Sequence, residues 1–213
     1  MAILGFLLAG YLLGSLPFAV IVSRGFGLDD PRSYGSKNPG ATNVLRSGNK
    51  LAALLTLLGD ALKGWLAVWL AQRYAPEFGL GSLAIAFTGL AAFLGHVFPV
   101  FLRFRGGKGV ATAAGVLVGY GPWIGLVVLG VWIATAALFR YSSLAAVVAA
   151  VCAPFVILKF QGADDYFAAA TVMSTVLILR HLGNIKRLAA GQESRIGRKK
   201  SPEQGAAEPT NRN

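Results

Sequence analysis

Residues 110–139 read VATAAGVLVGYGPWIGLVVLGVWIATAALF, a run of 30 positions without a charged side chain. A helix needs about 20 apolar residues to cross a bilayer, so this run is long for one crossing. Gly119-Tyr120-Gly121-Pro122 interrupts its middle, and a proline begins a helix comfortably but fits poorly inside one. We therefore predict that the run forms two short helices.

The composition places the rest of the chain in a membrane as well. Hydrophobic residues make up 55% of the sequence and charged residues only 14%, against about 25% in a typical soluble domain. Further apolar runs of roughly membrane-spanning length occupy residues 2–23, 51–75, 80–102, 142–158 and 163–185. The predicted fold class is all-α, a polytopic integral membrane protein.

The distribution of charge predicts the number of helices and their orientation. If the run 110–139 crosses twice, the chain has seven transmembrane helices, and 17 of its 20 lysines and arginines lie on the side of the C-terminus. Basic residues accumulate on the cytoplasmic side of membrane proteins, so we expect the N-terminus outside and the C-terminus inside. The run 2–23 lacks a basic leader and a cleavage site, which favours a first span over a removable signal peptide.

The runs leave no space for a soluble domain between them. Residues 1–191 are expected to form one membrane-embedded domain, followed by a basic cytoplasmic tail at 192–213 that is expected to be disordered beyond residue 200. The formal net charge of +11 fits this orientation and attraction of the tail to anionic membrane lipid. Nucleic-acid binding is not expected, because no folded basic domain accompanies the charge.

A polar, cationic loop follows the first run and reads GSKNPGATNVLR over residues 35–46. Its glycines allow backbone conformations in which several amide N–H groups converge on one anion, and an arginine can hold two phosphate oxygens at once. The alternative is a solvated turn whose polar residues cap the next helix. The candidate phosphate ligands in this loop are Gly35, Ser36, Lys37, Asn38, Gly40, Thr42, Asn43 and Arg46.

A second loop of the same kind reads RGGKGVAT over residues 105–112. Gly106, Gly107 and Gly109 permit close backbone approach to an anion, and Lys108 supplies a point charge. The pattern fails the nucleotide P-loop, because Gly109 stands where a serine or threonine should follow the lysine. We therefore expect phosphate binding at this loop, but not ATP binding.

Several ionisable or polar residues lie within the apolar runs or at their ends. Asp60 and Lys63 share a helix face, where they either form an internal ion pair or support the site. His96 is followed five residues later by Phe101 and not by the carboxylate that a general base would need, so we expect a structural hydrogen bond for it. His181 and Asn184 share a face at the end of the last run, either as capping residues or as site residues.

Five sequence blocks make the chain resemble the bacterial acyl-phosphate:glycerol-3-phosphate acyltransferases from about residue 10 to residue 200. The blocks are GSLPF at 14–18, GSKNPGATN at 35–43, GDALKG at 59–64, GHVFP at 95–99 with GGKGVAT at 106–112, and RHLGNIKR at 180–187. Lys37 and Pro39 stand where that family more commonly has Gly and Ile or Val.

The resemblance implies a seven-helix enzyme of the bacterial inner membrane with its active site on the cytoplasmic side. It implies transfer of a fatty acyl group from acyl phosphate to the 1-hydroxyl of glycerol 3-phosphate, which gives lysophosphatidate and phosphate in phospholipid biosynthesis. It also places five residues of this chain in the substrate pocket as catalytic residues. They are Ser36, Arg46, Lys108, His181 and Asn184.

The residue types fit that reaction. Acyl phosphate is already activated, so no covalent nucleophile is needed, and we expect direct attack by the glycerol hydroxyl with a substrate phosphoryl oxygen or His181 accepting the proton. No cofactor and no metal are expected, since two histidines and few carboxylates do not form a ligand set. A transporter of phosphorylated small molecules is the rival function, and a non-catalytic lipid-binding scaffold is the third.

Overall fold

The computed structural model describes residues 1–197, and the disorder expected beyond residue 200 lies outside the described residues. Within that range the regular secondary structure is helical throughout. The α-helices are α1 (Ala2–Gly14), α2 (Phe18–Gly25), α3 (Ala41–Val44), α4 (Lys50–Tyr74), α5 (Ser82–Val97), α6 (Val110–Tyr120), α7 (Pro122–Phe139), α8 (Ser142–Phe160), α9 (Asp165–Arg180) and α10 (Leu182–Ala189). Short 3-10 helices occupy three connections: η1 (Leu45–Ser47), η2 (Ala75–Phe78) and η3 (Val100–Leu102).

Several helical segments are long and apolar enough to cross a membrane. The described residues contain five of them, or six if α9 and α10, which meet at a 55° bend, form one span. The five are Ala2–Gly25, Lys50–Phe78, Ser82–Leu102, Pro122–Phe139 and Ser142–Phe160. The predicted class, an all-helical polytopic membrane protein, is confirmed.

The run 110–139 divides at Gly121, as its Gly-Pro signal predicts. Pro122 occupies the first turn of α7, where its missing N–H costs no intrahelical hydrogen bond. The prediction of two short helices is wrong for α7, which has 18 residues, whereas α6 has 11. The break follows the eleventh residue of the run, so the second helix is the longer of the two.

Close packing of small residues holds the helices together. Gly14 of α1 lies against the backbone of Ala92 in α5, and Gly115 of α6 lies against the backbone of Ala61 in α4. A Cβ at either glycine would collide with a backbone carbonyl, so the close packing of these helix pairs requires glycine at both positions. The common core behind them contains the fully buried Phe93 of α5 and further residues of α4 to α9, including Val68, Val116 and Ile157.

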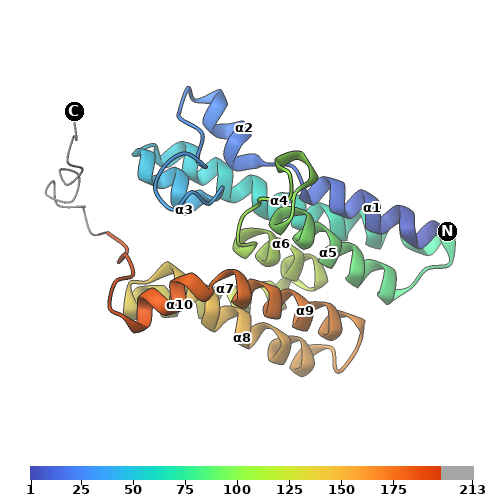
Figure 1. Cartoon of the computed structure of the whole chain (residues 1–213). Helices are drawn as coiled ribbons and strands as arrows, with labels where there is room; N and C mark the ends of the chain where they lie inside the picture. Colours follow the sequence, from blue (N-terminus) through green and yellow to red (C-terminus); the bar gives the residue numbers. More distant parts are fainter. Residues whose placement is uncertain (198–213) are drawn as a thin grey trace, which may run out of the picture.

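The arrangement in space brings the helix of the first glycine-rich loop and the last helix to the same end of the bundle. In Figure 1, α3 and α10 lie toward the same end, and the N-terminus lies at the opposite end. Large apolar side chains cover the outer faces of the long helices, including Leu62, Trp123 and Leu138, each more than half exposed. Such surfaces are stable in contact with lipid, so the fold presents its polar chemistry at the bundle end.

Candidate functional site

The first glycine-rich loop is braced from inside by Asn43, whose side chain is buried. Its amide nitrogen donates to the carbonyls of Pro31 at 2.6 Å and Tyr34 at 3.2 Å, and its oxygen accepts from the backbone N–H of Ser36 at 2.9 Å. The prediction that Asn43 donates to a phosphate is therefore wrong, because both amide hydrogens already serve the loop. Sequence alone could not separate a bracing asparagine from a ligand-binding one.

The loop around this brace is curved by two residues with left-handed backbone. Gly35 has φ +59°, and Lys37 has φ +54° at a position where the resembling family more commonly has glycine. Gly40 has φ −157°, so the special conformation predicted for it is not present. Ser36, Lys37 and Thr42 are exposed on the loop, whereas Asn38 is partly buried.

Arg46 lies over Gly35 and faces the same side of the loop. A Cβ on Gly35 would come within 3.1 Å of the Arg46 Cδ atom, so the glycine leaves the space that the arginine side chain occupies. Arg46 contacts the Asn43 oxygen through Nη1 at 3.4 Å. The alternative of a plain capping turn does not account for the loop, because Asn49, outside the glycine-rich stretch, caps α4 by accepting from the Ala52 N–H at 2.9 Å.

The second glycine-rich loop lies against α5. Gly106 and Gly107 are buried, and the Gly107 N–H donates to the His96 carbonyl at 3.1 Å. A Cβ at Gly107 would collide with the His96 ring, and one at Gly109, where φ is +86°, would collide with Phe93. These glycines were predicted to let an anion approach, but they let the loop approach α5 instead. Lys108, which is only partly buried, is the residue of this stretch that can meet an anion.

Lys108 connects this loop to the last helix. Its ammonium donates to the side-chain oxygen of Asn184, a buried residue of α10. The Asn184 amide nitrogen in turn donates to a carboxylate oxygen of Glu193 at 2.6 Å. The structure thus joins two predicted catalytic residues, Lys108 and Asn184, and adds an acidic one.

The segment after α10 continues across the site. Glu193 also accepts from Ser143 of α8 at 2.8 Å and from Arg187 at 2.7 Å, and Ser194 accepts a 3.4 Å contact from Arg46. Arg46 on the first loop is thereby linked to the Lys108 cluster through residues 193 and 194. Sequence reasoning missed Glu193 and Ser143, because it assigned the former to a featureless tail and the latter to an apolar helix.

Charge in this cluster alters the protonation of its members. Burial lowers the pKa of Lys108 from 10.5 to about 8; Glu193 opposes this shift, and Arg187, Arg180 and Arg46 add to it. Burial by itself would raise the pKa of Glu193, but hydrogen bonds from Asn184, Ser143 and Arg187 outweigh it and hold that pKa below its ordinary value. The site is therefore a concentration of positive charge with one balancing carboxylate.

His181 lies at the bend between α9 and α10 and is buried. Its Nδ1 atom lies 2.8 Å from the Leu177 carbonyl oxygen, which can only accept, so Nδ1 carries the hydrogen and Nε2 of the neutral ring is free to accept one. The neighbouring Arg180 donates to the Gly106 carbonyl at 3.0 Å. The bend thus brings the last helix onto the second loop.

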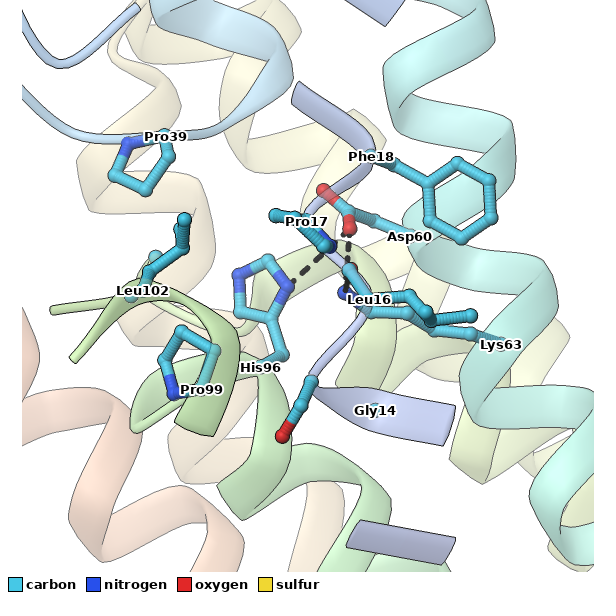
Figure 2. Close-up of a pocket in the computed structure, with 13 residues that line it drawn as sticks. Gly14, Leu16, Pro17, Phe18, Pro39, Asp60, Lys63, His96, Pro99 and Leu102 are labelled. Carbon is cyan, nitrogen blue, oxygen red and sulfur yellow. Dashed lines mark hydrogen bonds and ion pairs between the residues drawn. The ribbon is translucent and has the colours of Figure 1, made fainter. Parts of the chain in front are cut away.

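Asp60, Lys63 and His96 form a separate buried network, which Figure 2 shows beside a small pocket between the two loops. Asp60 Oδ1 lies 2.7 Å from Lys63 Nζ and 3.3 Å from His96 Nδ1. The internal ion pair of Asp60 and Lys63 is confirmed. The expectation that His96 has no carboxylate partner is wrong, because Asp60 supplies one from α4, which the local spacing along α5 does not reveal.

Fold and site together define a multi-pass membrane protein with a cationic site made by two glycine-rich loops and the end of the last helix. The sequence profile of the family described as "Glycerol-3-phosphate acyltransferase" matches residues 4–191. The chain belongs to this family of integral membrane acyltransferases, which act in lipid biosynthesis.

Individual relatives and solved structures agree. The chain is 62% identical to a glycerol-3-phosphate acyltransferase of Ralstonia nicotianae, covering 92% of this chain and 95% of that protein. It is 60% identical to one of Cupriavidus necator, over 94% and 99% of the two chains. Crystal structures of PlsY (YgiH), an integral membrane glycerol 3-phosphate acyltransferase, superpose with TM-scores of 0.85 for the glycerol 3-phosphate form and 0.84 for the lysophosphatidic acid form, at 38% identity over 92% of this chain and 96% of that one.

Proposed function

We propose that this enzyme transfers a fatty acyl group from acyl phosphate to the 1-hydroxyl of glycerol 3-phosphate, giving lysophosphatidate and inorganic phosphate. One observation supports this most directly: Arg46 and Lys108, from loops far apart in sequence, are linked through Asn184, Glu193 and Ser194. Two cationic loops match a reaction in which both substrates carry a phosphate group.

In this proposal Arg46 and Lys108 hold the substrate phosphates, and the exposed Ser36 and the buried Asn184 add neutral hydrogen bonds. The remaining exposed or partly buried loop residues, Lys37, Asn38 and Thr42, contribute to the same anionic surface, while Gly35 and the glycines of the second loop shape it. Asn184 is fixed by Glu193, so its oxygen is directed at Lys108 before a substrate arrives. Pre-arranged groups of this kind lower the barrier because they need no reorganisation during the reaction.

The chemical step follows from the substrates. The oxygen of the glycerol 1-hydroxyl forms a bond to the acyl carbonyl carbon, the bond from that carbon to the phosphate oxygen breaks, and phosphate leaves. The hydroxyl proton passes to a phosphoryl oxygen of a substrate or to Nε2 of His181, which the Leu177 contact leaves able to accept it. Orientation of two bound reactants supplies on the order of 7–11 kcal/mol of such a barrier.

We further propose that residues 1–191 form the membrane domain and cross the bilayer seven times, with the N-terminus outside. The count adds α6 to the six possible spans, counting α9 and α10 as one. The orientation rests on the excess of lysine and arginine in the connections at the site end. It places Lys108 and its neighbours on the cytoplasmic side of the inner membrane, where water-soluble glycerol 3-phosphate is available.

The donor assignment is tested with purified protein, glycerol 3-phosphate and three alternative acyl donors in parallel: acyl phosphate, acyl coenzyme A and an acyl carrier protein thioester. We expect lysophosphatidate only with acyl phosphate. Product formed only with a thioester would contradict the donor. Reconstituted vesicles test the rival transport function, because uptake of glycerol 3-phosphate without product would indicate a carrier.

A further inference from the structure

A buried group of ionisable side chains lies apart from the Lys108 cluster. Asp60 and Lys63 of α4 and His96 of α5 are 3%, 3% and 7% exposed. Charged groups at membrane depth persist where they are paired or have a function. The ion pair of Asp60 and Lys63 is enough to balance their two charges. The side chains of the group nevertheless make contacts with two further parts of the chain.

In one direction the group reaches the break in the N-terminal span. The Lys63 ammonium donates to the Leu16 carbonyl at 2.8 Å while it lies 2.7 Å from Asp60 Oδ1. Leu16 lies between α1 and α2, next to Pro17, which has no N–H to give. Lys63 thereby fixes the position of this break on α4.

In the other direction the group reaches the second glycine-rich loop. Asp60 fixes the plane of the His96 ring through Nδ1 at 3.3 Å, and the ring fills the space that a Cβ on Gly107 would need. The Gly107 N–H is bound to the His96 carbonyl at 3.1 Å, and the Gly106 carbonyl accepts from Arg180 at 3.0 Å. The loop is therefore held between α5 and the end of α9 one residue before Lys108.

We propose that Asp60, Lys63 and His96 are positioning residues, which register the loop 103–109 against α5 and so determine where the Lys108 ammonium meets the substrate phosphate. They act through Gly107 and need not touch the substrate. The inference rests on the proposed function, because one of its tests measures acyl transfer. A second test measures binding of glycerol 3-phosphate and does not depend on turnover.

A double-mutant cycle tests the contact on which the inference depends. His96→Asn keeps an N–H for Asp60 but removes the ring beside Gly107, and Gly107→Ala pushes a methyl group into that ring. We expect each single variant to lower kcat/KM for glycerol 3-phosphate at least tenfold, chiefly through KM. The double variant should lose no more than the worse single variant, because asparagine leaves room for the methyl group. Losses that multiply to a hundredfold would overturn the inference.

A second variant covers the case in which an unpaired charge prevents folding. Asp60→Asn/Lys63→Met removes both charges together, so no buried ion is left without a partner. We expect a KM at least tenfold higher. We also expect the fall of kcat/KM at alkaline pH to begin at a pH higher than about 8, because a loosened loop admits water to Lys108 and so raises its pKa. Glu193, Arg187, Arg180 and Arg46, the charges that act on Lys108, are unchanged in this variant.

Thr88→Val is the matched control. Thr88 is buried on α5 like His96, but within residues 1–197 its hydroxyl bonds only to the Ala84 carbonyl of its own helix, at 2.6 Å. If the variants of Asp60, Lys63 and His96 behave as this control does, with an unchanged KM and an unchanged fall of kcat/KM at alkaline pH, the inference is overturned. Binding is measured in parallel as the upward shift in melting temperature that we expect on adding glycerol 3-phosphate. A wild type that binds but does not acylate it would contradict the proposed function, while the binding comparison would still decide this inference.

Discussion

The Glu193 carboxylate accepts a hydrogen bond of 2.6 Å from the side-chain nitrogen of Asn184, which fixes the amide so that its oxygen faces Lys108. An asparagine amide turned the other way would present N–H groups to the ammonium and repel it. Glu193 therefore determines both the orientation of Asn184 and part of the field at Lys108. This relationship connects the segment after α10 to the chemistry of the second loop.

Replacing Glu193 by glutamine tests that relationship through pH. Glu193 raises the pKa of Lys108 against the lowering effect of burial, so its loss should move that pKa further below about 8. We expect the alkaline limb of kcat/KM to move to lower pH in Glu193→Gln. Glu77→Gln, which removes a carboxylate from an exposed pair with Arg73, should leave the limb in place. An unmoved limb in Glu193→Gln would contradict the assignment.

The wild-type pH profile carries a prediction of its own. Only the protonated form of Lys108 attracts phosphate, and its pKa of about 8 lies below the 10.5 of an ordinary lysine. Activity that depends on this charge is complete below pH 8 and is lost as the pH rises through that value. We expect kcat/KM, which reports the free enzyme, to fall above about pH 8. A profile that stays flat to pH 10 would show that Lys108 does not control turnover.

Removing the Lys108 charge should have a large effect on activity and little on folding. We expect Lys108→Ala to lose at least a hundredfold in kcat/KM, about 2.7 kcal/mol, while the protein stays folded in detergent and loses only about 1 kcal/mol of stability with the bond to Asn184. Lys186→Ala on the exposed side of α10 is the control and should retain activity. Full activity in Lys108→Ala would show that the second loop only connects two helices and does not bind phosphate.

Arg46→Lys separates charge from geometry in the first loop. Lysine keeps the positive charge but cannot present two parallel N–H groups to one phosphate. We expect at least a tenfold loss in kcat/KM, about 1.4 kcal/mol of transition-state stabilisation. The measurement is steady-state kinetics with both substrates varied, alongside a melting curve. Turnover equal to wild type would mean that a point charge suffices there.

Asn43→Ala should destabilise the first loop. The change leaves the Pro31 carbonyl and the Ser36 N–H without their partner and removes one of two donors to the Tyr34 carbonyl, which keeps the Lys37 N–H. Each lost bond contributes roughly 1 kcal/mol. We expect a loss of about 2–3 kcal/mol in stability and a higher KM for the phosphorylated substrate. Ser33→Ala, which removes an exposed bond to the Asp30 carbonyl, should change neither. An unaltered melting temperature in Asn43→Ala would contradict the bracing role.

Membrane sidedness is tested with single cysteines in a Cys152→Ala background. Ala163→Cys lies in the connection between α8 and α9, and Lys186→Cys lies on α10; both positions are exposed. In right-side-out vesicles a membrane-impermeant thiol reagent should label Ala163→Cys directly and Lys186→Cys only after the vesicles are opened. Labelling of Lys186→Cys in closed vesicles would contradict the proposed seven crossings.

The sequence by itself determined the class of fold and the location of the loops. Apolar runs, the break before Pro122 and the glycine-rich cationic stretches are local signals, because hydropathy and backbone freedom belong to consecutive residues. The pairing of Asp60 with Lys63 was predictable for the same reason, since both lie on one turn of one helix. These signals also predicted that Arg46 and Lys108 serve anions.

Only the tertiary structure decided which side chains meet. Asp60 reaches His96 because α4 packs beside α5, and no spacing within either helix encodes that approach. The amide of Asn43 turns inward because the chain folds back over it from Pro31 to Tyr34, which a list of polar residues cannot show. Glu193 enters the site because α10 bends by 55° from α9 and carries the following residues across Lys108 and Arg46. Contacts between distant segments depend on helix packing and bend angles, which are collective properties of the whole bundle, and so the chemistry of this site is fixed at that level.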